Sequence, residues 1–207
     1  MGDKRLNERL ITVADAFLSR PQLPINAACD DWTDTKAAYR LFDNDKVTAP
    51  KVLAPHLCRT QQRIGSETQV FAIQDTTYLD YTTHQETAGL GPISTPAQKI
   101  RGLVKHTTLL LGSDGCPLGV ITDDIWAREE APLGQEPPKT IEEKESYKWI
   151  AALRQTVERV PSDVSVITIC DREADLYDFF VEATDLKTQF LIGPPLCQPN
   201  PQPSVKR

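Results

Sequence analysis

Long apolar runs, paired cysteines and an excess of positive charge are all missing from this sequence. No apolar stretch approaches the ~20 residues that a membrane-spanning helix requires, and the first residues are too polar for a secretory signal peptide. The five cysteines are scattered without a Cys-x-x-Cys pair, which indicates neither a zinc knuckle nor a disulfide framework. We therefore expect a protein of the reducing cytoplasm.

The charge of the chain argues against a general nucleic-acid binder, because the net value is −6. The charge is unevenly distributed: residues 1–66 contain ten Lys/Arg and eight Asp/Glu, so this segment carries +2 and the remainder −8. The asymmetry has two interpretations. It is either an ordinary solvated surface, or a mildly basic DNA-contacting module joined to an acidic core that binds metal.

Several familiar catalytic motifs are also absent. The sequence has no phosphate-binding Walker loop, no dinucleotide fingerprint and no Ser-His-Asp arrangement, and it contains no internal repeat. Its 207 residues are enough for one domain and a small second one.

The first 66 residues predict a small helical module. Apolar residues at helical spacing indicate a helix over residues 3–19 and a second over residues 34–43, with Asp34 as its N-cap. Thr48 and Pro50 favour the start of a third helix, and residues 65–66 look like a boundary. The basic side chains of this module form either a solvated face or a set of phosphate contacts; they are Lys4, Arg5, Arg9, Lys36, Arg40 and Lys51.

The pattern changes to alternating strands and helices over residues 67–193. We expect strands at 69–74, 106–111, 117–122, 164–170 and 189–192, with helices at 143–160 and 172–183. This β-β-β-α-β-α-β order predicts an α/β fold with a mixed sheet. Residues 194–207 contain five prolines and are expected to form a disordered tail.

Two of the expected strands each run into an aspartate, Asp75 and Asp171. If the strand 164–170 lies parallel beside 69–74, both carboxylates meet at one edge of the sheet, where α/β proteins gather their chemistry. Two carboxylates make a hard oxygen site that suits Mg²⁺ or Mn²⁺ and two-metal phosphoryl transfer. Each residue also has a plainer interpretation, because aspartate favours turns and helix caps.

The residues around Asp171 have alternative roles. Arg172 is either a phosphate contact or the partner of a nearby acid. Glu173 and Asp175 fit a favourable interaction with a helix N-terminus, and an outer-shell role for either is the alternative. We expect His106 to be a satisfied core residue and Cys170 a small buried apolar one.

Four stretches together resemble one family. They are Ala-Tyr-Arg-Leu-Phe at 38–42, Ala-Ile-Gln-Asp-Thr-Thr at 72–77, Glu-Lys-Glu-Ser-Tyr-Lys-Trp at 143–149 and Ile-Cys-Asp-Arg-Glu-Ala-Asp at 169–175. The chain is similar, from about residue 2 to residue 192, to cut-and-paste DNA transposases of the insertion-sequence-four family, most closely the transposon-five type.

The resemblance implies an RNase-H-like core with a catalytic triad of two aspartates and a glutamate. By motif match the aspartates are Asp75 and Asp171, which would hold Mg²⁺, with Mn²⁺ as a substitute. Such enzymes hydrolyse a phosphodiester at the transposon end and join the freed 3′-hydroxyl to target DNA. The resemblance also implies that the helical module binds double-stranded transposon ends and that the protein acts as a homodimer.

No position of the sequence matches the family's glutamate, which stands in a Tyr-x-x-Arg-x-x-x-Glu pattern after the fifth strand. The resemblance stops near Ile192, which indicates an incomplete core, and our hypothesis is a frameshift or a premature stop. Three functions stay open: a transposase-family protein that is inactive alone, a truncated end-binding regulator or inhibitor of the full-length enzyme, and a remnant without a selected role.

Overall fold

The computed structural model of the protein describes residues 2–84, 86–95, 98–130 and 140–193. The chain divides into two compact units, Met1–Cys58 and Arg59–Arg207. The division falls inside helix α4 (Ala49–Ile64), whereas the sequence suggested a boundary at residues 65–66. The last turn of α4 belongs to the second unit because Ile64 is fully buried in its core. The proline-rich segment 194–207 lies outside the described residues.

The first unit is helical, as expected, and contains α1 (Lys4–Ser19), α2 (Ile25–Ala28) and α3 (Trp32–Phe42). The N-cap of α3 differs from the expectation: the carboxylate of Asp31, not of Asp34, accepts a hydrogen bond from the backbone N–H of Asp34, at 2.8 Å. Asp34 instead pairs with Arg9, with 2.9 Å between the guanidinium and the carboxylate. The core of the unit consists of Val13, Cys29, Ala38 and Leu41.

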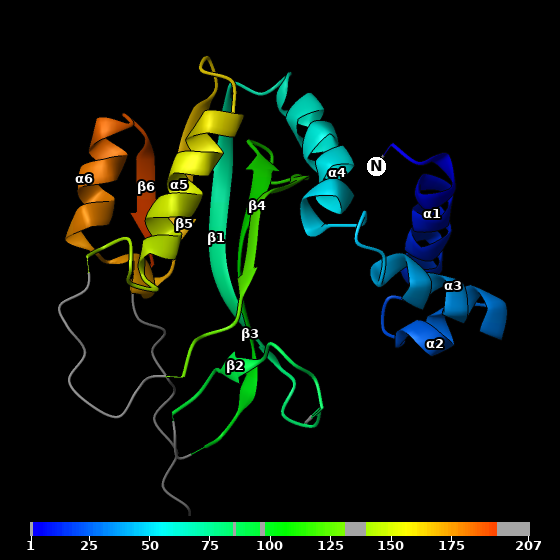
Figure 1. The fold of residues 1–207 in the computed structure, drawn as a ribbon. Coiled ribbons are helices and arrows are strands. Elements are labelled where there is room, and N and C mark those ends of the chain that lie inside the picture. Colours follow the sequence, from blue (N-terminus) through cyan, green and yellow to red (C-terminus); the bar gives the residue numbers. More distant parts are fainter. Residues whose placement is uncertain (1, 85, 96–97, 131–139, 194–207) are drawn as a thin grey trace, which may run out of the picture. The chain divides into compact units, whose positions relative to one another are not determined.

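The second unit is built on a six-stranded mixed sheet, which confirms the predicted fold class. Its strands are β1 (Gln69–Asp80), β2 (Gly91–Pro92), β3 (Arg101–Gly112), β4 (Pro117–Trp126), β5 (Ser165–Cys170) and β6 (Gln189–Ile192). The strand order is β2-β3-β1-β5-β6, and β4 also pairs with β3 (Figure 1). Strand β3 runs antiparallel to both β1 and β4, whereas β5 and β6 run parallel to β1.

Strand β1 is longer than the sequence suggested and does not end before Asp75. Its parallel pairing with β5 stops at Ile73, which lies opposite Ile169, but its antiparallel pairing with β3 continues to Asp80. The extension was missed because β3 begins at Arg101, well before the predicted start of that strand. Asp75 therefore lies inside a strand, at the point where the strand loses one of its two neighbours.

Helices α5 (Tyr147–Arg159) and α6 (Tyr177–Asp185) complete the described part of this unit (Figure 1). The prediction of one helix over residues 172–183 is wrong. A short 3₁₀ turn, Arg172–Ala174, is followed by Leu176 in an extended conformation, so α6 starts only at Tyr177. Among the described helices, none is both long and apolar enough to cross a membrane.

The two faces of the sheet are unequal. On one face, Val70 and Ala72 are buried in a core cluster with Leu110 of β3 and Val166 of β5. A second cluster contains residues of α5 and α6. The alternate side chains point to the other face and are only half-buried. One apolar row on this face runs across four strands, because the half-buried Leu109, Ile73 and Ile169 pair in turn and Ile169 pairs with the exposed Leu191.

Leu110 provides a test of the covered core, because its side chain is fully buried in β3. Leu110→Ala leaves a cavity and is expected to lower the free energy of unfolding by about 3 kcal/mol. The matched control is Leu191→Ala in β6, where the side chain is 60% exposed and the expected change is within about 0.5 kcal/mol. Urea denaturation followed by tryptophan fluorescence measures both; equal losses would contradict this description of the core.

Candidate functional site

Asp75 and Asp171 lie on neighbouring parallel strands. Asp75 comes two residues after Ile73 in β1, and Asp171 comes two residues after Ile169, the partner of Ile73 in β5. The pairing of the two strands ends at Ile73 and Ile169, so Asp75 and Asp171 each follow the last paired residue of their strand by two positions. Both residues are exposed. The parallel arrangement that the sequence anticipated is therefore present, although Asp75 does not end its strand.

One oxygen of each carboxylate takes part in a local hydrogen bond. Asp171 Oδ1 accepts from the backbone N–H of Glu173 at 2.8 Å, so the expected capping role is real and serves the 3₁₀ turn. Asp75 Oδ2 accepts from the Thr77 hydroxyl at 3.3 Å. Mg²⁺ commonly binds through one or two carboxylates, with waters and phosphate oxygens as further ligands. The pair fits this donor set, although the described residues contain no group of three or more His, Cys, Asp or Glu that could hold a metal ion.

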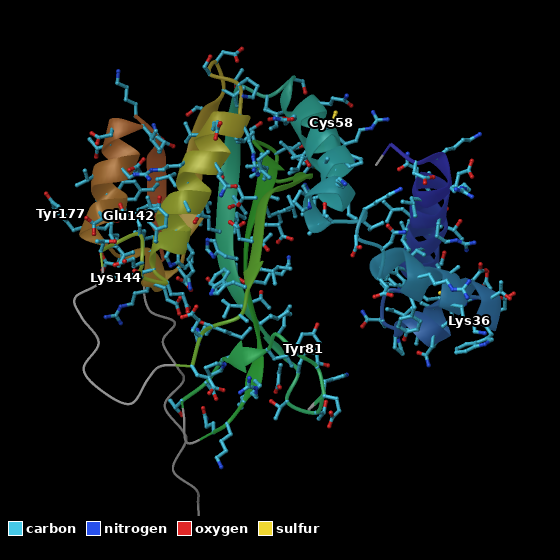
Figure 2. The ribbon with its side chains drawn as sticks, viewed as in Figure 1. Lys36, Cys58, Tyr81, Glu142, Lys144 and Tyr177 are labelled. Carbon is cyan, nitrogen blue, oxygen red and sulfur yellow. The ribbon has the colours of Figure 1, made fainter. Side chains whose placement is uncertain are left out.

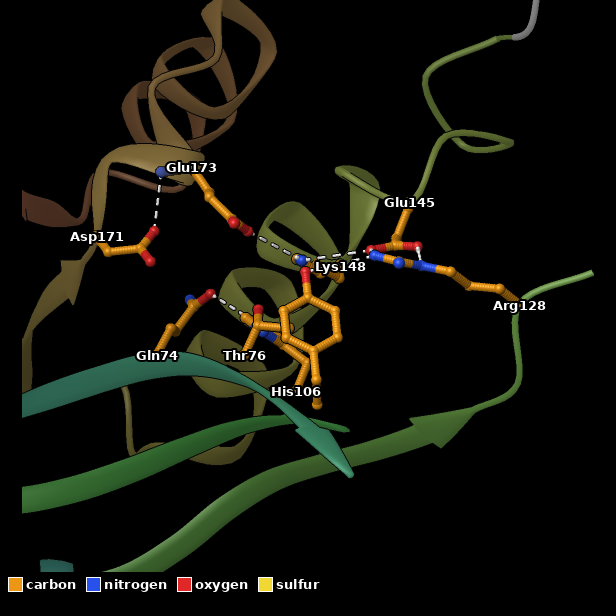
Figure 3. Close-up of polar contacts among 9 residues, drawn as sticks. Gln74, Thr76, His106, Arg128, Glu145, Lys148, Asp171 and Glu173 are labelled. Atoms are coloured by element: carbon orange, nitrogen blue, oxygen red, sulfur yellow. Dashed lines mark hydrogen bonds and ion pairs between the residues drawn. The ribbon is translucent and has the colours of Figure 1, made fainter. Parts of the chain in front are cut away.

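A buried histidine of β3, His106, lies opposite Thr76 of β1 on the covered face of the sheet (Figure 3). His106 is 1% exposed; its Nδ1 is 2.9 Å from the Thr76 hydroxyl and its Nε2 is 3.2 Å from Oε1 of Gln74. The pKa of His106 is lowered to about 4, mainly by burial and also by the charge of Lys148, whereas the charge of Asp75 opposes the shift. The expectation of a satisfied core histidine is confirmed.

A chain of charged side chains leads from the loop after β4 to the neighbourhood of Asp171 (Figure 3). Arg128 donates two hydrogen bonds to the Glu145 carboxylate, at 2.5 and 2.7 Å. The side chain of Lys148 is only 8% exposed, and its Nζ lies 3.7 Å from Glu145 Oε1 and 3.3 Å from Glu173 Oε2. Sequence reasoning assigned no role to Arg128, Glu145 or Lys148, although the last two belong to the stretch 143–149 that supported the family resemblance.

The remaining residues near Asp171 have the following surroundings. Arg172 is exposed and forms no ion pair with any other described residue. Glu173 bonds to Lys148, and Asp175 ends the 3₁₀ turn. Cys170 is buried as expected, and burial raises the pKa of its thiol to about 12.

Three of the predicted DNA-contacting residues share one surface hollow in the helical unit. Arg5, Arg9 and Arg40 line a hollow of about 610 Å³ together with Lys46, which sequence reasoning missed. Lys46 follows the end of α3 in the sequence, and only the fold shows that it lines the same hollow as Arg5 and Arg9.

The other predicted basic residues of this unit make contacts elsewhere. Lys4 pairs with Glu8 at 3.7 Å. Lys36 on α3 (Figure 2) lies 5.2 Å from the ring centre of Trp32, an exposed aromatic residue. Lys51 Nζ donates to the backbone carbonyl of Lys46 at 3.0 Å.

Comparison with known proteins gives two findings. Residues 1–47, which include the three helices α1 to α3, match the family described as transposase DNA-binding. Among solved structures, the chain resembles the crystal structure of a pre-cleavage Mos1 transpososome, with 10% sequence identity and a TM-score of 0.30. That likeness covers 86% of this chain and 57% of the other, so this chain spans less than two thirds of the protein it matches.

The Arg128–Glu145 pair makes a pH-dependent contribution to stability. The hydrogen bonds from Arg128 hold the pKa of Glu145 below its usual range, so the contribution is fully present above the unfolded value of about 4.3 and is lost as pH falls through the lower folded value. Arg128→Met should cost about 1 kcal/mol at neutral pH. The melting temperatures of the wild type and Arg128→Met, measured between pH 7 and pH 3, should converge at the acid end. For Lys144→Met, at an exposed position, the difference from the wild type should not depend on pH. A pH-independent difference for Arg128→Met would contradict this role.

Proposed function

We propose that this chain is a cut-and-paste transposase-family protein of the insertion-sequence-four, transposon-five type. The helical unit would bind double-stranded transposon ends, with the protein acting as a homodimer on paired ends. The observation that carries the proposal is the transposase DNA-binding match over residues 1–47. The hollow lined by Arg5, Arg9, Arg40 and Lys46 supports it, because guanidinium and ammonium groups around one hollow suit phosphate oxygens.

The second part of the proposal is a divalent cation, Mg²⁺ or Mn²⁺, held by Asp75 and Asp171. The parallel register of β1 and β5 supports it, because Asp75 and Asp171 each lie two residues beyond the last paired residues, Ile73 and Ile169. When bound, such an ion supplies charge stabilisation and an activated nucleophile for phosphodiester hydrolysis and strand transfer. Asp75 and Asp171 would orient the ion, and the exposed Arg172 would contact a phosphate beside it.

Cleavage of DNA depends on how firmly the cation is held. In-line attack requires closely fixed reacting groups, and two carboxylates restrain a cation less than three do. We therefore propose that the described residues bind transposon ends more effectively than they cut them.

DNA binding is tested by combining Arg40→Ala with Lys46→Ala in the hollow. If both residues contact phosphates, affinity for duplex DNA falls and the slope of log K against log[salt] decreases by about 0.9 for each phosphate that the variant no longer neutralises. Lys144→Ala removes one exposed charge from the other unit and serves as the control (Figure 2). Electrophoretic mobility shifts at salt concentrations between about 50 and 200 mM measure the slopes; an unchanged slope in the double variant would exclude this hollow as the DNA-binding surface.

The cation site is tested with Asp75→Asn and Asp171→Asn, each compared with Asp80→Asn on the same strand as Asp75. Either of the first two should weaken Mn²⁺ binding at least about tenfold, as measured by electron paramagnetic resonance of free Mn²⁺, whereas Asp80→Asn should leave it unchanged. Mg²⁺-dependent nicking of transposon-end DNA by the wild type that disappears in Asp75→Asn would show that the chain also cuts. Equal Mn²⁺ affinity in all four proteins would rule out the site.

A further inference from the structure

The side chains on both sides of Asp75 are bonded to a single imidazole. Gln74 and Thr76 point to the covered face of the sheet, whereas Asp75 between them points to the opposite face. His106 lies across from Thr76 on β3 and reaches both neighbours, at 3.2 Å from Gln74 Oε1 and 2.9 Å from the Thr76 hydroxyl. Asp75 is thus flanked on its own strand by two anchored side chains, as Figure 3 shows for Gln74 and Thr76.

The imidazole itself has little freedom to move. It is 1% exposed, and the ring of Trp149 packs edge-on against it with 4.5 Å between ring centres. Gln74 Oε1 can only accept, so Nε2 carries the proton and donates; Nδ1 then accepts from the Thr76 hydroxyl. Both ring nitrogens are used, and a neutral imidazole satisfies both contacts.

The contacts of His106 lie at the point along β1 where the strand loses one of its two neighbouring strands. The parallel pairing with β5 ends at Ile73, so beyond this residue β1 is paired only with β3. A strand paired on one side has more freedom to twist and shift than one paired on both. The contacts of His106 begin one residue after the parallel pairing ends, where β5 no longer restrains the strand.

We propose that His106 is a positioning residue for Asp75, fixing the backbone on both sides of this carboxylate where β1 loses its parallel neighbour. The proposal rests on the proposed cation site, in which Asp75 must keep a constant distance from Asp171. His106 does not contact the cation; it acts through Gln74 and Thr76 from the other face of the sheet. Groups that orient a metal ligand in this way commonly change metal affinity by about 10–100-fold when removed.

The test uses two variants that break these contacts. His106→Leu removes both hydrogen bonds while keeping an apolar side chain against Trp149, and Thr76→Val removes one bond at nearly constant volume. Two controls accompany them. Thr76→Ser keeps the hydroxyl, and Thr122→Val on β4 removes a different buried bond, the 2.6 Å contact between the Thr122 and Thr108 hydroxyls. Thr76→Val keeps the proposal testable should His106→Leu fail to fold.

Three quantities are measured on each full-length protein: melting temperature, amide hydrogen exchange of residues 74–77 without metal, and Mn²⁺ affinity. We expect His106→Leu and Thr76→Val to speed the exchange of these amides and to weaken Mn²⁺ binding about tenfold. Thr76→Ser and Thr122→Val should leave both within about twofold, although Thr122→Val lowers the melting temperature.

Unchanged exchange and unchanged affinity in Thr76→Val and His106→Leu, with melting temperatures lowered as in Thr122→Val, would overturn the proposal and leave His106 a purely structural residue. Failure of the wild type to bind Mn²⁺ would count against the cation site alone. In that case the exchange of the metal-free proteins would still decide whether His106 fixes the strand around Asp75.

Discussion

The parallel pairing of β1 with β5 is the interaction on which the rest of the second unit depends. Parallel neighbours cannot be joined by a tight turn, so the chain must cross over the sheet between them, and α5 lies on this crossover. The crossover covers one face with Trp149, Ile150 and Leu153. The same pairing joins Ile73 to Ile169, the residues two positions before Asp75 and Asp171, although these segments are far apart in sequence. The covered core and the candidate site are therefore consequences of one register.

The register also explains how much of the fold could be read from the sequence. Short, mostly apolar runs before Asp75 and Asp171 identify strands that are paired on both sides. The extension of β1 to Asp80 was not predictable in this way, because beyond Gln74 the strand is paired on one side and its side chains are polar or exposed. Patterns of apolar residues do not predict a strand segment that is held by hydrogen-bonded pairing and not by burial of its side chains.

In the candidate site too, some residues could be identified from the local sequence and others only from contacts made by folding. The aspartates could be named because a charged residue directly after an apolar run is visible in sequence. The capping of α3 by Asp31 and the break at Leu176 depend on backbone geometry within one or two residues, which similar Asp-rich stretches leave ambiguous. Arg128 and Lys46 gained their roles only from partners brought close by folding, so no local signal identified them.

The row of apolar side chains that runs from the half-buried Leu109, Ile73 and Ile169 to the exposed Leu191 has an electrostatic consequence. Ile73 and Ile169 of this row precede Asp75 and Asp171 by two residues, so each exposed carboxylate follows a half-buried hydrocarbon side chain. Hydrocarbon is weakly polarisable, and attraction between opposite charges grows as the surrounding dielectric constant falls. A cation between the two aspartates would therefore be screened less than on a wholly polar surface, and added salt would weaken its binding less than it weakens contacts at the exposed arginines of the helical unit.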